Sequence, residues 1–419
     1  MTEVSGIGQF PATALDGQDF SARCADKSCF FVMPDTHQQI RKDEPKTMQA
    51  IFGNLLQLDI KLVIMWIIGG VLIYLAIKKD MEPSLLLPMG FGAILVNLPN
   101  SGAITQGDEI GVLNVLYDAG IANELFPLLL FIGIGAMIDF GPLLQSPYLL
   151  IFGAAAQLGV FAVMSLACLF GFNIQDAASI GVIGAADGPT AIFVSQYFNS
   201  QYTGAIMVAA YSYMALVPII QPPVIRAITT KKERTIHMKY SASTVSKQTK
   251  ILFPIMVTLI AGLVVPRSVA LVGFLMFGNL LRECGVLDSL SQTAQNVLAN
   301  LITIFLGITI ASQMQADQFL NPRTLLIMGL GLLAFVFDTF GGVIFAKVIN
   351  IFLSEGKKIN PMIGACGISA FPMSSRVISK MALKEDKENY LLMQAAGVNV
   401  GGQIASVIAG GMILNLVAR

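Results

Sequence analysis

The chain has 419 residues, of which 55% are hydrophobic and only 12% are charged. Soluble domains carry about 25% charged residues, so this composition predicts a polytopic α-helical membrane protein and argues against a soluble one. The 26 basic and 26 acidic residues give a formal net charge of zero, which indicates no nucleic-acid partner.

The first 47 residues are polar and lack the apolar run of a signal peptide. We therefore interpret residues 1–47 as a polar N-terminal tail and assign it no function, noting that Met33 and Met48 are alternative start positions. The five cysteines are scattered and have no accompanying His ligands, so we expect free thiols at Cys24, Cys29, Cys168, Cys284 and Cys366.

Long apolar runs follow the tail. Several are shorter than the roughly 20 residues that span a bilayer, or are interrupted by Gly and Pro. We therefore expect about ten membrane elements, some of them discontinuous or re-entrant. The runs are 62–77, 85–98, 126–140, 148–170, 178–197, 205–220, 251–265, 269–281, 298–312, 325–353, 361–377 and 390–417.

The densest basic cluster lies within residues 226–250, and the positive-inside rule places this segment in the cytoplasm. It also separates two membrane halves. We thus predict a first half at 48–228, a basic cytoplasmic loop at 229–250 and a second half at 251–419.

The two halves resemble each other. The segment from Phe131 is similar to the one from Phe305, and each leads to an Ile-Gly-Ala triplet, at 183–185 and at 363–365, that opens a Gly/Pro-broken segment. A repeat with broken helices in matching positions is the best sequence indication of a midplane substrate site in transporters.

Asp187 lies inside the first broken segment, followed by Gly188 and Pro189. A carboxylate in the middle of a membrane segment costs about 2.5–3.5 kcal/mol on insertion scales, so it usually has a compensating cation or proton. We interpret Asp187 as an ion ligand that alternates between a cation and a proton. The alternative is a carboxylate that only caps the following helix.

Two tyrosines, Tyr211 and Tyr213, follow in the same half, before prolines at 218, 222 and 223 that we expect to interrupt the helix. Tyr211 can be an interfacial anchor or part of the site. Tyr213 is the better functional candidate, since a phenol can pass a proton in an apolar site.

The second broken segment supplies further candidates. Asn360 can cap a helix, whereas Ser369 and nearby carbonyls are hard oxygens of the kind an alkali cation needs. Arg376 has a planar fork that matches a carboxylate bidentately, although an arginine at a membrane edge can also simply extend its charge to water.

The last apolar run places Asn399 and Gln403 four residues apart on one helix face, either as packing contacts or as a second set of cation ligands. Two other carboxylates have apolar neighbours. We place Asp139 at a helix end, in a structural role, and Asp338 deeper, as a candidate for the ion path.

The motifs GAADGPTAIF at 184–193 and NPMIGACGISAFPMSSRVISK at 360–380 strongly resemble the β subunit of the sodium-pumping biotin-dependent decarboxylases. This family includes the oxaloacetate, methylmalonyl-CoA, glutaconyl-CoA and malonate decarboxylase systems. The likeness extends from about Met48 to the end of the chain.

The resemblance implies that carboxybiotin, delivered by a separate carrier subunit, is decarboxylated at the cytoplasmic side while Na+ moves outward and a proton is consumed. It assigns the essential positions of the family to particular residues. These are Asp187, Tyr213, Asn360, Gly364, Ser369 and Arg376, with Asn399 as a further Na+ ligand.

The resemblance also implies an inverted-repeat, elevator-like fold in the cell membrane. The expected partners are a carboxyltransferase α subunit, the biotin carrier and a small γ or δ membrane subunit, with the β subunit itself forming a trimer. A secondary Na+-coupled carboxylate transporter, in which Arg376 holds a free substrate carboxylate, is the alternative. A membrane scaffold without transport is a third possibility, against which Asp187 argues.

Overall fold

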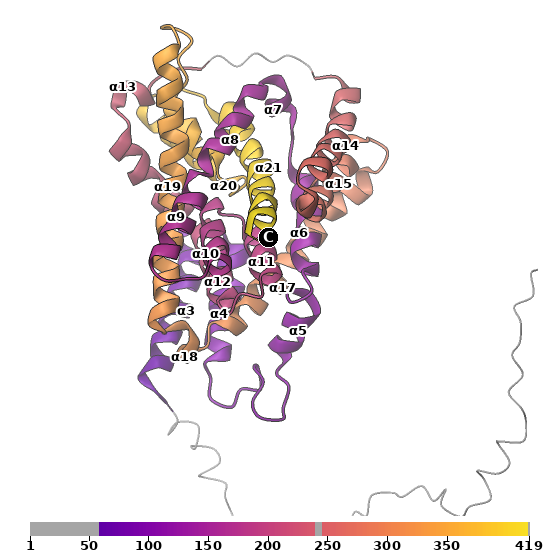
Figure 1. The fold of residues 1–419 in the computed structure, drawn as a ribbon, viewed down its shortest axis with the longest axis vertical. Helices are drawn as coiled ribbons and strands as arrows, with labels where there is room; N and C mark the ends of the chain where they lie inside the picture. The colour runs from indigo at the N-terminus through magenta and orange to yellow at the C-terminus, as the bar shows by residue number, and fades with distance from the viewer. Residues whose placement is uncertain (1–57, 239–244, 418–419) are drawn as a thin grey trace, which may run out of the picture. The chain divides into compact units, whose positions relative to one another are not determined.

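The computed structural model describes residues 58–238 and 245–417, which lie in one compact unit (Figure 1). These residues are almost entirely helical, and the only β-type pairing among them is an isolated bridge between Gln106 and Glu109. The predicted all-α class is therefore confirmed. The N-terminal tail, with Cys24 and Cys29, lies outside the described residues, whereas Cys168, Cys284 and Cys366 are free thiols as expected.

The first half begins with a helical hairpin, α3 and α4, in which Gly69 and Gly90 let the two backbones pack closely. A bent pair, α5 and α6, follows with an angle of 64° between its helices. The helices of this half are α3 (Ile60–Lys79), α4 (Pro83–Val96), α5 (Val112–Gly120), α6 (Leu125–Met137), α7 (Gly141–Gln145), η2 (Pro147–Leu149), α8 (Leu150–Ala156), α9 (Leu158–Leu169), α10 (Ile174–Gly181), η3 (Val182–Ala185), α11 (Gly188–Tyr197) and α12 (Thr203–Ile228).

The expected loop at 229–250 is partly helical, because it contains α13 and the start of α14. The second half then runs through to α21. The elements after α12, in the loop and the second half, are α13 (Lys231–Arg234), α14 (Lys247–Val264), η4 (Pro266–Ser268), α15 (Val269–Glu283), α16 (Asp288–Gln292), the π-helix η5 (Thr293–Leu298), α17 (Ala299–Ile310), η6 (Ala311–Gln313), α18 (Ala316–Phe319), α19 (Pro322–Phe352), η7 (Pro361–Gly367), α20 (Met373–Glu385) and α21 (Leu392–Val417).

Seven helical stretches among the described residues are long and apolar enough to cross a membrane. The bent pair α5–α6 adds an eighth candidate, and two shorter apolar stretches, Pro83–Val96 and Ile174–Ala185, lie beside them. The number agrees with the expectation of about ten membrane elements. The chain is a multi-pass membrane protein.

The helices of the two halves pair in the same pattern. α15 packs on α6 as α17 packs on α4, and α20 packs on α21 as α11 packs on α12. α12 packs on α19, while α21 packs on α8. This pattern supports the internal repeat, whereas the inverted orientation and the elevator-like movement stay predictions.

Both predicted broken segments are present. The first is interrupted at Ala186, which adopts a left-handed conformation with φ 51°, and at Asp187, which is extended. The second leaves its 3-10 helix at Gly367, and α20 begins only at Met373. Irregular backbone inside a membrane needs polar partners or a cavity, so these breaks mark the region where ligands can bind.

The expected interruption of α12 by its three prolines is wrong. The helix continues from Thr203 to Ile228 through Pro218, Pro222 and Pro223. Membrane helices tolerate proline because neighbouring helices and local adjustments take over the freed backbone groups.

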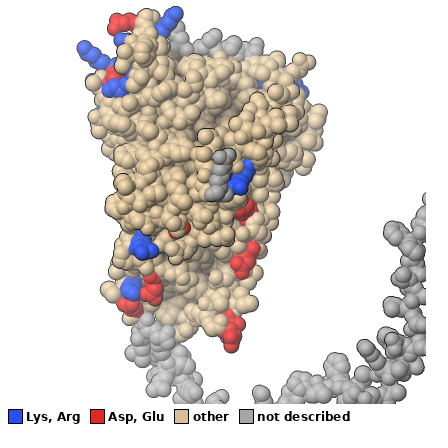
Figure 2. Space-filling view, in the orientation of Figure 1, with Lys and Arg blue, Asp and Glu red and all other residues tan. Residues whose placement is uncertain are grey.

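Charged side chains lie mostly toward the ends of the molecule. Figure 2 shows basic side chains with a few acidic ones at the end that carries α13, and acidic side chains interspersed with basic ones over the lower half of the view. From the basic cluster at 226–250, the positive-inside rule predicts that the α13 end lies in the cytoplasm.

Candidate ion site and basic pocket

Asp187 lies where the first broken segment changes direction, between η3 and α11, and only 3% of its surface is exposed. Gly188 and Pro189 open α11 directly after it. A side chain at Gly188 would overlap the ring of Tyr211, so glycine is required at this position. The break thus brings a carboxylate and an aromatic ring together in the interior.

The Asp187 carboxylate accepts hydrogen bonds only from neutral groups. Thr190 Oγ1 donates to Oδ2 at 2.7 Å, Ser406 Oγ at 2.9 Å and Gln403 Nε2 at 3.4 Å. No Lys, Arg or His among the described residues forms an ion pair with it. A buried carboxylate without a basic partner needs a cation or a proton.

Helix capping alone does not account for Asp187. The Thr190 amide in the first turn of α11 interacts with the carboxylate, but Asp187, at the N-cap position, makes no capping bond of full hydrogen-bond geometry. Its hydroxyl and amide partners come instead from α11 and α21. Two elements distant in sequence therefore converge on one carboxylate oxygen.

Ser369 connects the second broken segment to the first. Its backbone N–H and its hydroxyl both donate to the carbonyl oxygen of Ala185, each at 3.0 Å, and the hydroxyl also interacts with the Asp187 carboxylate. Gly364 has a different surrounding, because it packs directly on the backbone of Gly342 in α19. Ser369 therefore contacts the Asp187 carboxylate, whereas no described contact joins Gly364 to it.

Asn399 links α21 to the second break. Its Nδ2 donates to the carbonyl oxygens of Cys366 at 3.3 Å and Ile368 at 2.8 Å, while its Oδ1 is buried and has no partner. Gln403, one turn later, reaches Asp187. The Nδ2 group of Asn399 thus holds α21 against the second break, and its Oδ1 atom is available to a cation.

Asn360 makes its contacts away from this cluster. Its Oδ1 accepts from the Met362 amide at 3.1 Å, which caps η7, and its Nδ2 donates to the carbonyls of Arg234 and Ile236. The two Nδ2 bonds connect η7 to the end of α13 and to the segment that follows it. No described contact joins Asn360 to Asp187.

The two tyrosines differ. Tyr211 is fully buried, its ring lies against Gly188, and its hydroxyl has no hydrogen-bond partner. An interfacial anchor would be exposed at one end, so that alternative is excluded for Tyr211. The Tyr213 hydroxyl donates to the Met328 carbonyl at 2.5 Å and joins α12 to α19.

Asp338 is fully buried in α19. Its Oδ1 accepts from the backbone amides of Gly159 at 2.6 Å and Val160 at 3.2 Å, where the chain passes from α8 into α9. Its Oδ2 has no partner and lies against Gly184. Asp139 lies after α6, where it accepts from the Gly141 amide at 2.8 Å and from Lys250 at 3.4 Å, which fits the expected helix-end role.

Sequence reasoning did not assign Ser406, Thr190 or Gln221. Ser406 follows Gln403 by three residues and so lies on the same helix face. This spacing alone could have predicted that Ser406 lies near the site. Gln221 donates to the Ala365 carbonyl at 2.8 Å and accepts from the Ser374 hydroxyl at 2.9 Å, which ties α12 to η7 and α20.

Arg376 lies outside the Asp187 cluster, in a pocket of about 350 Å³ between α12, α20 and the α3–α4 connection. We call it the basic pocket. Burial raises the pKa of the neighbouring Glu82 carboxyl, and the Arg376 guanidinium opposes this rise. The basic pocket is lined by Lys79, Asp80, Met81, Pro218, Pro222, Arg226, Met373, Arg376, Val377, Lys380, Met381 and Lys384.

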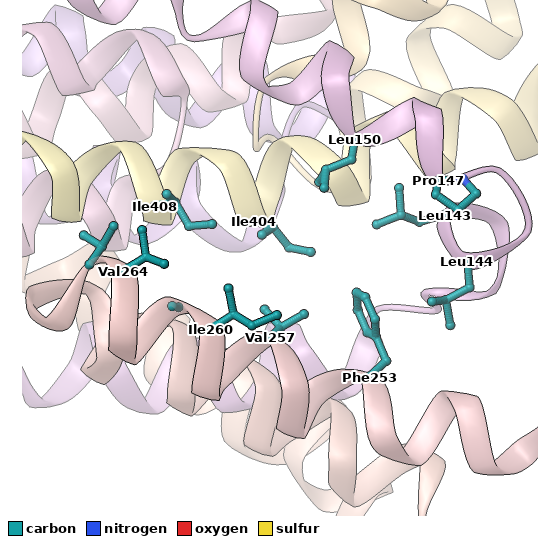
Figure 3. A pocket seen from close by; sticks show the side chains of 12 residues that line it. Leu143, Leu144, Pro147, Leu150, Phe253, Val257, Ile260, Val264, Ile404 and Ile408 are labelled. Atoms are coloured by element: carbon teal, nitrogen blue, oxygen red, sulfur yellow. The ribbon is translucent and has the colours of Figure 1, made fainter.

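A second pocket, of about 300 Å³, lies between α14, α21 and the α7–α8 region (Figure 3). Its lining is entirely apolar, and Figure 3 shows Phe253, Val257 and Ile260 of α14 facing Ile404 and Ile408 of α21. Such a lining offers neither charge nor hydrogen bonds to a carboxylate or a cation. Of these two pockets, only the basic pocket carries charged side chains.

The fold is that of a multi-pass membrane protein, and a buried carboxylate without a basic partner is typical of one that moves ions. The family model described as "Na+-transporting oxaloacetate decarboxylase beta subunit" matches residues 61–417, and the chain belongs to this family. It is a decarboxylase-translocase of the membrane and a subunit of a larger complex, which confirms the resemblance found in its motifs.

Curated relatives agree. The chain is 42% identical to the oxaloacetate decarboxylase beta chain of Klebsiella pneumoniae over 87% of its own length and 97% of that protein. It is 47% identical to the methylmalonyl-CoA decarboxylase subunit beta of Veillonella parvula over 85% of its length and 93% of that protein. For the corresponding Propionigenium modestum subunit the identity is 46%, over 84% and 94%.

Proposed function

We propose that this chain decarboxylates carboxybiotin, delivered by a carrier subunit to the cytoplasmic end, and couples this step to outward Na+ transport with consumption of a proton. The observation that supports it most directly is the Asp187 carboxylate, buried between two broken segments and bound only by neutral groups. Such a carboxylate can exchange a cation for a proton as the site changes access.

The Na+ ligands that we propose are Asp187, Ser369 and Asn399, since they present hard oxygens within or beside the cluster. Ser369 holds the second break against the first through Ala185, and Asn399 holds α21 against the second break through Ile368. The family resemblance adds Asn360 and Gly364. Their described contacts are to backbone groups, so we infer that these two residues shape the second break.

Arg376 is proposed to hold the carboxylate of carboxybiotin. The pocket of about 350 Å³ is large enough for a small ring system, and a guanidinium binds a carboxylate with two parallel hydrogen bonds. On decarboxylation, the bond between the ureido nitrogen and the carboxylate carbon breaks, CO2 leaves, and the nitrogen takes a proton. Tyr213 is the proposed donor or relay of that proton.

The proposed assembly is a trimer of this subunit with a carboxyltransferase α subunit, a biotin carrier and a small γ or δ membrane subunit. The α subunit would determine which acyl substrate feeds the pump. These features follow from the family resemblance.

The test is Na+-dependent decarboxylation of free carboxybiotin by the complex reconstituted in vesicles. Decarboxylation that requires Na+ and accumulates Na+ inside inverted vesicles is the expected result. The alternative, a secondary Na+-coupled carboxylate transporter, predicts carboxylate uptake driven by a Na+ gradient and no release of CO2. That outcome would replace the proposal.

A further inference from the structure

The basic pocket contains more positive charge than one carboxylate requires. Five cationic side chains line it, and Asp80 is the only acidic one. None of the five forms an ion pair within the described residues. One of them, Arg376, is sufficient for the single carboxylate of carboxybiotin, which leaves Lys79, Arg226, Lys380 and Lys384 with Asp80 as the one anion in the lining.

These cations converge from three elements. Arg376, Lys380 and Lys384 follow each other at four-residue intervals and form one row along α20. Like charges at this spacing repel each other and destabilise a helix, so an anionic partner would relieve the repulsion. Arg226 comes from the end of α12 and Lys79 from the end of α3, and all five side chains are exposed.

The size of the pocket determines what can enter it. A volume of about 350 Å³ accommodates a small ligand such as a biotin ring, but no folded domain. A protein that inserts carboxybiotin must therefore remain outside, with its surface over the mouth of the pocket. The exposed cations would then face that surface.

We propose that Lys79, Arg226, Lys380 and Lys384 form a docking site for an acidic surface of the protein that carries carboxybiotin. This inference rests on the proposed function and adds the means by which the carrier is recognised. Complementary charge steers a partner to its site and speeds association, and the effect weakens as salt screens it.

Anionic lipid headgroups are the other possible source of negative charge at the cytoplasmic end. The geometry favours a protein partner, because the four cations share one concave pocket with the substrate-binding arginine. Other cations of the same end, such as Lys231 and Lys232 on α13, are exposed and unpaired but lie outside this pocket. They provide a matched control.

The experiment measures rebinding of the biotinylated carrier subunit to the complex from which the carrier has been removed, in vesicles of phosphatidylcholine with or without phosphatidylglycerol, at several salt concentrations. The test variant is Lys380→Gln/Lys384→Gln and the control is Lys231→Gln/Lys232→Gln. We expect about tenfold weaker carrier affinity and a smaller salt dependence for the test variant only. The KM for carrier-bound carboxybiotin should rise in parallel.

Equal effects in the two double variants, or unchanged carrier affinity in the test variant, would overturn the docking site. An effect seen only with phosphatidylglycerol would assign the cations to lipid. The proposed function fails separately: wild-type complex that binds the carrier in a charge-dependent way but never decarboxylates carboxybiotin would refute the activity and retain the docking site.

Discussion

Replacing Asp187 by Asn removes one negative charge and leaves the size of the side chain almost unchanged. The oxygen that accepts from Thr190 and Ser406 can be supplied by the amide carbonyl, and only the long contact to Gln403, at 3.4 Å, is easily lost. We therefore expect a change of about 1 kcal/mol or less in the free energy of unfolding.

The effect on Na+ should be far larger. Two unit charges 4 Å apart attract each other by about 4 kcal/mol at an effective dielectric constant near 20, so losing the carboxylate should weaken Na+ binding on the order of a thousandfold. The assay is Na+-stimulated decarboxylation together with uptake of radioactive Na+ into inverted proteoliposomes.

Asp139→Asn is the control. This half-exposed carboxylate accepts hydrogen bonds from Gly141 and Lys250, neither of which belongs to the Asp187 cluster. The Asp139→Asn variant should transport Na+ at the wild-type rate. If folded Asp187→Asn pumps Na+ with unchanged affinity, the reasoning fails, and the ion path must be sought around Asp338 and Asn399.

Three further substitutions test the remaining roles. Arg376→Lys retains the charge but loses the bidentate fork, so decarboxylation of free carboxybiotin should fall about tenfold to a hundredfold; unchanged turnover would exclude the carboxylate clamp. Tyr213→Phe should impair coupled proton uptake, measured with a pH dye inside vesicles. Tyr211→Phe removes a hydroxyl that has no partner and should leave proton uptake unchanged. The reverse result would assign the relay to Tyr211. Asp338→Asn should retain Na+-dependent turnover, and loss of Na+ dependence in this variant would place the carboxylate in the ion path. Asp338→Ala should lower the free energy of unfolding by about 1–3 kcal/mol, because two buried amides lose their acceptor.

The sequence was sufficient for the helical class and for both broken segments. Gly and Pro act locally on the backbone, so their positions near Asp187 and Pro372 determine where a helix can continue. The same local reasoning failed for α12, where Pro218, Pro222 and Pro223 lie inside a continuous helix. Tertiary packing, which a single sequence does not display, decides whether a membrane proline breaks its helix.

The Asp187 cluster was predicted only in part. Asp187, Ser369 and Gln403 were recognised as polar residues in apolar runs, but their partner Ser406 was not, because serine is common in membrane helices and carries no charge. The convergence of α11 and α21 on one oxygen depends on contacts more than 200 residues apart in sequence. Periodicity within a helix cannot reveal such contacts.

The burial of Tyr211 was likewise unpredictable. Its position near Tyr213 in one apolar run suits an interfacial ring equally well, and only the packing of α12 against Gly188 shows that it is interior. The charges of the basic pocket were visible one by one in the sequence, but their convergence from α3, α12 and α20 was not.

The central claim is that Na+ and a proton compete for Asp187. The most direct measurement is the apparent Na+ affinity of the reconstituted complex as a function of pH, in wild type and in Asp187→Asn. Protonation removes the anionic ligand, so the wild-type Na+ affinity should weaken as pH falls, approaching about tenfold per pH unit once the protonated form predominates. A wild-type Na+ affinity that does not change with pH, or the same pH dependence in Asp187→Asn, would contradict the claim.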